Sequence, residues 1–151
     1  MTEPTTYRRN AIETALGILS AVFAATFFLG ALLHLGIRVP LGFAAIEEPV
    51  ILPATIVEGT CGAALAVAAF AVLARKNGAW TVATAAHAFA LGGVLLGITA
   101  LAVGAGPSTE LNTIYHRVMV VALVAVLALL LSPVGRSALR RGASPTVIQS
   151  R

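Results

Sequence analysis

Six ionisable side chains lie inside long apolar stretches of the sequence, and they are the residues whose types could support chemistry. They are Glu13, His34, Glu58, His87, His116 and Arg117. An ionisable group within hydrocarbon costs about 2.5 kcal/mol or more, so it needs a partner, a water-filled cavity or a functional role. Glu58 is the central case, because it lies about two helical turns inside the apolar stretch that follows Pro49.

Several polar residues are expected at the same depth as Glu58. His34 lies near the end of the first apolar stretch, while Asn112, His116 and Arg117 lie near the start of the last one. Asn112 and His116 are four residues apart and share a helical face. We therefore predict a polar, ligand-binding pocket around Glu58, with Arg117 as its counter-ion. His87 lies nearer the opposite end of its stretch and is a more distant candidate.

Other roles for these residues remain open. Glu58 and Arg117 could form a structural ion pair, and the three histidines could be structural, each hydrogen-bonded to a neighbour. His34, His116 and Glu58 could hold zinc, copper or iron, although no His-x-x-x-His or Glu-x-x-His motif supports this. The same two histidines could ligate a haem. His116, Glu58 and His87 could form a proton path.

The composition favours a membrane protein. Of the 151 residues, 58% are hydrophobic and 11% are charged, against about 45–50% and about 25% in soluble domains. The net charge is +4, but the basic residues flank apolar stretches, so they indicate topology and contact with anionic lipid rather than nucleic acid. The single cysteine, Cys61, excludes an internal disulfide and is expected to be a small packing residue.

Four apolar stretches are long enough to cross a bilayer core of about 30 Å as helices. They run over about 11–37, 50–73, 80–103 and 111–131, and predict an all-α domain of four transmembrane helices over 11–132. We expect 1–10 to be a polar N-terminal segment and 133–151 a basic cytoplasmic tail, of which 136–151 lacks regular structure. Segment 38–49 is expected to lie against the membrane surface, and Ser108 to cap the last span.

The charge distribution predicts the orientation. Four spans place both termini on one side, and that side would hold eight of the ten Lys and Arg residues: Arg8, Arg9, Arg75, Lys76, Arg136, Arg140, Arg141 and Arg151. Since positively charged loops stay in the cytoplasm, both termini are predicted to be cytoplasmic, in a bacterial inner or plasma membrane.

The layout resembles that of the small DoxX-like integral membrane proteins. The resemblance covers about residues 11–132 and rests on the glycine-containing first span (Leu29-Gly30-Ala31 and Leu35-Gly36-Ile37) and on the prolines that precede Glu58 in the second. The sequence from Pro53 to Gly59 is also similar to that of small uncharacterised bacterial membrane proteins. The DoxX resemblance implies an association with quinone-linked or thiol-linked redox complexes, but it carries over no catalytic residue, and the single Cys61 does not fit a thiol relay.

The sequence thus favours a non-enzymatic membrane protein, either an accessory subunit or a binder of a small amphipathic molecule such as a quinone, a sterol-like lipid or a drug. One alternative is a metal-, redox- or quinone-linked enzyme subunit, and another is a small ion or proton translocator. The bilayer is the expected partner, together with a membrane protein or further copies of the chain. No cofactor is identified from the sequence.

Overall fold

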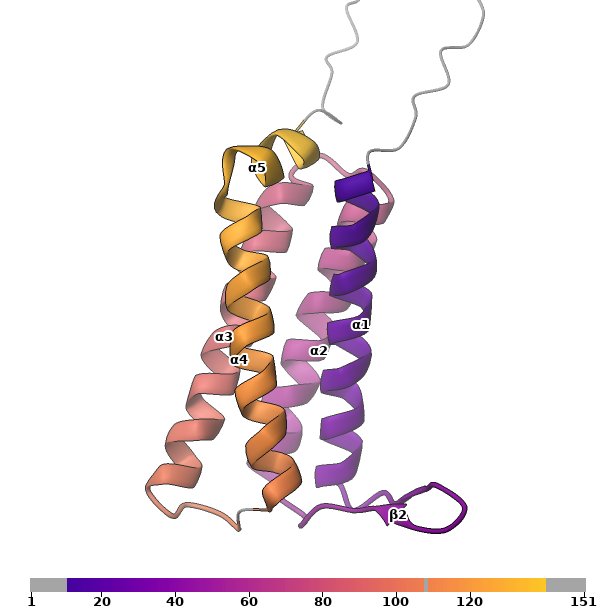
Figure 1. Cartoon of the computed structure of the whole chain (residues 1–151), viewed down its shortest axis with the longest axis vertical. Helices are drawn as coiled ribbons and strands as arrows, with labels where there is room; N and C mark the ends of the chain where they lie inside the picture. Colours follow the sequence, from indigo (N-terminus) through magenta and orange to yellow (C-terminus); the bar gives the residue numbers. More distant parts are fainter. Residues whose placement is uncertain (1–10, 108, 141–151) are drawn as a thin grey trace, which may run out of the picture.

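The computed structural model describes residues 11–107 and 109–140, which form five helices and two short strands (Figure 1). In chain order they are α1 (Ala11–His34), β1 (Val39–Pro40), β2 (Ala45–Ile46), α2 (Leu52–Leu73), α3 (Ala79–Ala102), α4 (Glu110–Leu131) and α5 (Pro133–Arg140). The prediction of an all-α bundle of four long helices is confirmed. The predicted segment 1–10 and the part of the basic tail beyond residue 140 lie outside the described residues.

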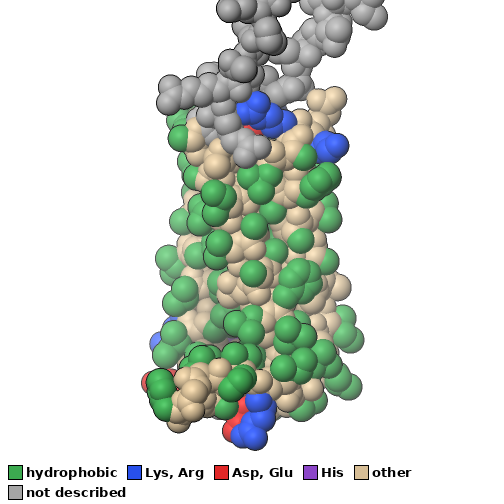
Figure 2. Space-filling view, turned by 90° about the vertical axis from the view of Figure 1, so that its right-hand side faces the viewer, with side chains coloured by type: hydrophobic (Ala, Val, Ile, Leu, Met, Phe, Trp, Pro, Cys, Tyr) green, Lys and Arg blue, Asp and Glu red, His purple; other side chains and the backbone are tan. Residues whose placement is uncertain are grey.

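Helices α1 to α4 are each long and apolar enough to cross a membrane. Large hydrophobic side chains are exposed along all four, including Val22, Phe70, Leu96 and Val121. On the face shown in Figure 2, hydrophobic side chains cover the length of the bundle, while charged side chains gather toward its two ends. The chain is therefore a multi-pass membrane protein whose apolar helices face lipid.

Glycines allow the helices to approach one another closely. A Cβ added at Gly93 of α3 would lie 2.6 Å from Sγ of Cys61 on α2. A Cβ added at Gly97, one turn further on, would overlap the imidazole of His116 on α4. The Gly93-x-x-x-Gly97 motif thus serves two different helix interfaces, as small residues commonly do between transmembrane helices.

The α1–α2 connection differs from its prediction. α1 ends at His34 rather than near Ile37, because Gly36 takes a left-handed conformation with φ of +86° and ends the helix. The chain then forms a short antiparallel hairpin in which Val39 pairs with Ile46. Phe43 in the hairpin loop is 95% exposed.

The start of α4 also differs in detail. Thr109 rather than Ser108 caps the helix, because the Thr109 hydroxyl accepts a hydrogen bond from the backbone N–H of Asn112 at 3.0 Å. Residue 108 itself lies outside the described residues. The cap fixes where α4 begins, and therefore the height of the polar residues in its first turns.

Residues 136–140 were predicted to lack regular structure, but they belong to α5 (Pro133–Arg140). Ala138 and Leu139 are buried, and Arg136 and Arg140 place their guanidinium carbons 5.3 Å and 4.4 Å from the centre of the Trp80 ring. The indole N–H of Trp80 donates to the carbonyl of Leu130 at 2.8 Å. The segment is amphipathic, but so short a helix is marginal on its own, and packing over Trp80 stabilises it.

The two ends of the bundle carry different charged groups. We call them the α5 end, which also holds the start of α1 and the α2–α3 turn, and the hairpin end, which also holds the α3–α4 connection (Figure 1). At the α5 end Arg75 donates to Glu13 at 3.0 Å. At the hairpin end Arg38 forms an ion pair with Glu47.

Candidate ligand-binding site

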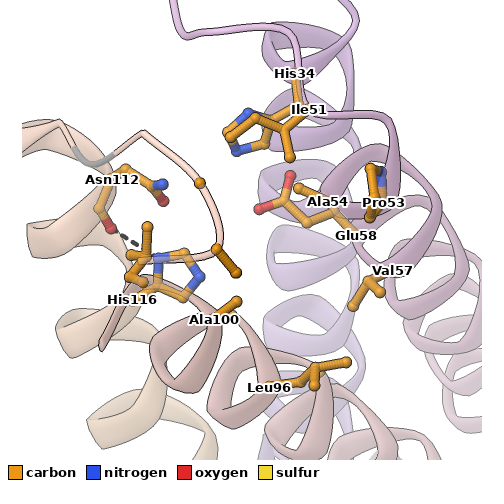
Figure 3. A pocket seen from close by; sticks show the side chains of 15 residues that line it. His34, Ile51, Pro53, Ala54, Val57, Glu58, Leu96, Ala100, Asn112 and His116 are labelled. Carbon is orange, nitrogen blue, oxygen red and sulfur yellow. Dashed lines mark hydrogen bonds between the residues drawn. The ribbon is translucent and has the colours of Figure 1, made fainter. Parts of the chain in front are cut away.

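A cavity of about 260 Å³ lies toward the hairpin end of the bundle (Figure 3). Its polar wall is formed by His34 of α1, Glu58 of α2, and Asn112 and His116 of α4. The remaining wall is apolar and comes mainly from the second and third helices: Ile51, Pro53, Ala54, Val57, Gly93, Leu96, Gly97, Ala100, Leu101, Ala105 and Gly106. A small polar wall within a mostly apolar cavity is the usual composition of a small-molecule site.

Glu58 is held by the close approach of α1 and α2. It is 6% exposed, and its carboxylate lies against Gly30, where an added Cβ would overlap it. Its Oε2 atom has no hydrogen-bond partner among the described residues. Glu58 is therefore a buried carboxylate with free acceptor capacity, which is costly in a membrane.

His116 presents one particular nitrogen to the cavity. Its Nδ1 lies 2.8 Å from the backbone carbonyl of Asn112, one turn earlier in α4. A carbonyl only accepts hydrogen bonds, so Nδ1 carries the proton, and Nε2 of the neutral ring is an acceptor. Nε2 is also the atom that a Cβ at Gly97 would meet. Because Gly97 has no side chain, the His116 ring has room to point Nε2 away from the α4 backbone.

His34 has the same arrangement at the end of α1. Its Nδ1 donates to the carbonyl of Pro49 at 3.1 Å, and its own carbonyl accepts from the N–H of Ile51 at 3.0 Å. These two bonds tie the loop before α2 to α1. The ring lies over the Glu58 carboxylate (Figure 3), but no hydrogen bond or ion pair joins the two among the described residues. Nε2 of His34 is thus a second acceptor beside the carboxylate.

A second cavity, of about 150 Å³, lies on the other side of Glu58. Its lining comes from the first and last spans and from the loop before α2: Thr26, Leu29, Gly30, Leu33, His34, Ile46, Glu48, Glu58, Leu111, Asn112 and Tyr115. His34, Glu58 and Asn112 line both cavities. Glu48 accepts a hydrogen bond from the Thr109 hydroxyl at 2.8 Å, and the buried Tyr115 hydroxyl has no partner among the described residues. Glu58 therefore forms part of the wall of both cavities.

Arg117 was predicted to be the counter-ion of Glu58, and this prediction is wrong. Arg117 is exposed and lines neither cavity. The ion pairs between described side chains are Arg38 with Glu47 and Arg75 with Glu13, so they leave Glu58 without a cationic partner. Successive residues of a helix are about 100° apart, and with His116 facing the bundle, Arg117 points outward.

His87 is buried but belongs to neither cavity. It is 0% exposed, packs edge-on against Phe23 at 6.0 Å between ring centres, and its Nδ1 donates to the carbonyl of Ala83 at 2.8 Å. Its Nε2 has no hydrogen-bond partner among the described residues. Of the six predicted site residues, the structure brings together His34, Glu58, Asn112 and His116, and separates His87 and Arg117 from them.

The metal hypothesis gains no geometric support from residues 11–107 and 109–140. No group of three or more His, Cys, Asp or Glu side chains in these ranges lies close enough to hold a metal ion. His34, His116 and Glu58 share a cavity wall but do not converge on one point. Cys61 is buried against Gly93, as expected of a packing residue.

Three further residues shape the site and were not predicted as part of it. Gly30 and Gly97 make room for Glu58 and His116, while Glu48 lines the second cavity. Nothing in the sequence indicates which helix faces Gly30 or Gly97.

Comparison with known proteins finds no matching family model, no matching curated protein and no matching solved structure. The resemblance to DoxX-like proteins therefore stays a prediction.

Proposed function

We propose that the protein binds a small amphipathic molecule in the cavity beside Glu58. The observation that carries the proposal is that a carboxylate, two imidazoles and an amide, from three helices, line a cavity whose other lining groups are apolar. Three of these four side chains also line the second cavity. The polar head of a ligand would bind the polar wall, and its apolar body would contact the second and third spans.

The size of the cavity limits the ligand. Sites for drug-sized ligands measure about 300–1,000 Å³, and this cavity measures about 260 Å³. The ligand is therefore smaller than a typical drug, or leaves part of its apolar chain outside the cavity. A single medium-length alkyl chain with a compact head meets this limit.

The orientation belongs to the same proposal. The α5 end holds Arg75, Lys76, Arg136 and Arg140, whereas the hairpin end holds the ion-paired Arg38 and Glu47. The positive-inside rule then places the α5 end in the cytoplasm and the binding cavity in the outer half of a bacterial inner membrane. The ligand would reach the cavity from the outer leaflet or from the external solution.

The two alternative functions have less support. A translocator using His116, Glu58 and His87 would need His87 to join the chain of polar groups, but His87 lines neither cavity. A redox or quinone-linked enzyme subunit, as the DoxX resemblance implies, would need a cofactor or a partner subunit. The binding role needs neither.

A thermal-shift measurement tests the proposal. The full chain, in nanodiscs of zwitterionic lipid, is heated with each of four decyl probes that differ only in the head group: decylamine, decyltrimethylammonium, decanol and decanoate. Tm should rise with at least one probe. The rise should be lost in Ala100→Phe, which fills the cavity from α3, and in Ala54→Phe, which fills it from α2.

Two results would overturn the proposal. One is that no probe raises Tm of the native chain. The other is that both filled variants, folded by circular dichroism, respond to the probes as the native chain does. Two filling positions are used because overpacking one site can destabilise the fold by about 1–3 kcal/mol.

A further inference from the structure

We infer that the ligand's head group is a protonated amine, so that the site selects an amphipathic organic cation bearing N–H donors. This inference rests on the proposed binding function and adds a ligand class to it. It follows from the hydrogen-bond capacity and the charge of the side chains around Glu58.

The polar wall is rich in acceptors. His34 and His116 each direct Nδ1 at a backbone carbonyl, so Nε2 of each ring is an acceptor when the ring is neutral. The Glu58 carboxylate receives no hydrogen bond from the described residues; its Oε2 is closed off against Gly30, so Oε1 is the acceptor that it offers to a ligand. Asn112 offers both an amide donor and an amide acceptor. A head group with several donors matches this wall, whereas an acceptor-only head group would leave most of it unpaired.

The charge of the wall points to a cation. Glu58 lines both cavities and Glu48 lines the second, while no Lys or Arg of the described residues lines either. Arg117, which the sequence suggested as the counter-ion of Glu58, is exposed instead. A buried charge in a membrane requires compensation, and a cationic ligand provides it where the protein's own side chains do not.

The geometry suits a compact head group. The His34 ring lies over the Glu58 carboxylate without a direct hydrogen bond (Figure 3), so a group between them can bond to both. An alkylammonium has three N–H donors, which suits a wall that carries several acceptors. Since Glu58 lines both cavities, the alkyl chain can extend into either one while the head stays at the carboxylate.

The four decyl probes separate charge from hydrogen-bond donation. Decylamine at about pH 7 has both, as a lysine side chain does. Decyltrimethylammonium has the positive charge without N–H donors, decanol has a donor without a charge, and decanoate has a negative charge and no donor. We expect decylamine to bind at least about tenfold more tightly than each of the other three, as measured by titration of Tm in the same nanodiscs.

Glu58→Gln is the decisive variant, because it keeps the size and removes the charge. Decylamine affinity should fall at least about tenfold in this variant, while decanol affinity should change less than about threefold. Gly59→Ala is the matched control, since a Cβ at Gly59 meets nothing within 4 Å. Gly59→Ala should bind decylamine as the native chain does.

The outcomes distinguish the two proposals. If decanol or decanoate binds as tightly as decylamine, and the filled variants lose that binding, the site binds amphiphiles but the cation inference is wrong. Equal decylamine binding by the native chain and by Glu58→Gln would also overturn the inference. If no probe binds, the proposed binding function is wrong, and the cation inference that rests on it is wrong as well.

Discussion

At the scale of single residues, hydrogen bonds to the backbone decide what each histidine can do. His34, His87 and His116 all direct Nδ1 at a main-chain carbonyl. Each therefore holds its proton on the same nitrogen and presents Nε2 elsewhere. For His34 and His116 that nitrogen belongs to a cavity wall, whereas for His87 it is buried without a partner among the described residues. The same Nδ1 hydrogen bond to the backbone thus occurs both at the cavity wall, in His34 and His116, and in the packed core, in His87.

The glycine opposite His116 gives the first prediction. Ala at an unobstructed helix position is more stable than Gly by about 0.5–1 kcal/mol, and Gly92 is such a position, with nothing within 4 Å of an added Cβ. Gly92→Ala should therefore stabilise the protein or leave it unchanged. Gly97→Ala places the Cβ on the His116 ring and should cost about 1–3 kcal/mol. Reversible unfolding in mixed micelles measures both, and equal values would show that the ring has room to move.

His87 gives the second prediction. His87→Leu removes a buried nitrogen that lacks a partner among the described residues, and removing an unpaired polar atom avoids a penalty of about 1–3 kcal/mol. The free energy of unfolding should stay the same or rise, and decylamine binding should not change. His116→Leu, at the cavity wall, should weaken decylamine binding. A loss of binding in His87→Leu equal to that in His116→Leu would place His87 in the site and revive the proton-path hypothesis.

At the scale of elements, the helix ends set the height of the site and close the bundle. Thr109 caps α4 and also donates to Glu48, so a single side chain ties the start of α4 to the loop before α2. His34 makes the corresponding link between α1 and that loop. At the other end, α5 folds back over Trp80. The polar wall is therefore fixed by connections at the hairpin end, while the α5 end is closed by packing.

The docking of α5 gives the third prediction. A cation over an aromatic ring contributes about 0.5–1 kcal/mol at exposed sites, and Arg140 lies 4.4 Å from the centre of the Trp80 ring. Arg140→Ala should raise amide hydrogen exchange across α5 about two- to fivefold. Ser137→Ala is the control, because the partly exposed Ser137 side chain bonds only within α5. Unchanged exchange in Arg140→Ala would mean that Leu139 and Arg136 hold α5 without Arg140.

At the scale of the whole molecule, the orientation in the bilayer remains a prediction that follows from charge. The α5 end and the hairpin end lie at opposite ends of four spans. Phe43 marks the hairpin end and is exposed, and Ser137 marks the α5 end and is partly exposed. The single native cysteine, Cys61, is 0% exposed, so it should not react and the native chain serves as the background control.

These positions give the fourth prediction. In intact bacterial spheroplasts, a membrane-impermeant maleimide should label Phe43→Cys and leave Ser137→Cys unlabelled. Disruption of the membrane should make Ser137→Cys reactive. The opposite pattern would place the cavity in the inner leaflet, and a ligand would then reach it from the cytoplasm.

The number and bounds of the spans were determined by the sequence alone. The predicted spans agree with the four long helices within about three residues at each end. The spans can be predicted because a chain crosses lipid as a helix only where a long apolar stretch pairs all its backbone groups internally. A sequence of this composition has few ways to meet that requirement. The depth of Glu58, His34 and His116 follows from the same bounds.

The rotation of each helix was decided only by the tertiary structure. A helix that is apolar on all sides carries no stripe that distinguishes its buried face from its lipid-facing one. The sequence therefore predicted both His116 and Arg117 for the site, although adjacent residues cannot face the same way. Packing of Gly97 against His116 and of Gly30 against Glu58 settled which residues face inward. Because those contacts join residues far apart in the chain, no local pattern records them.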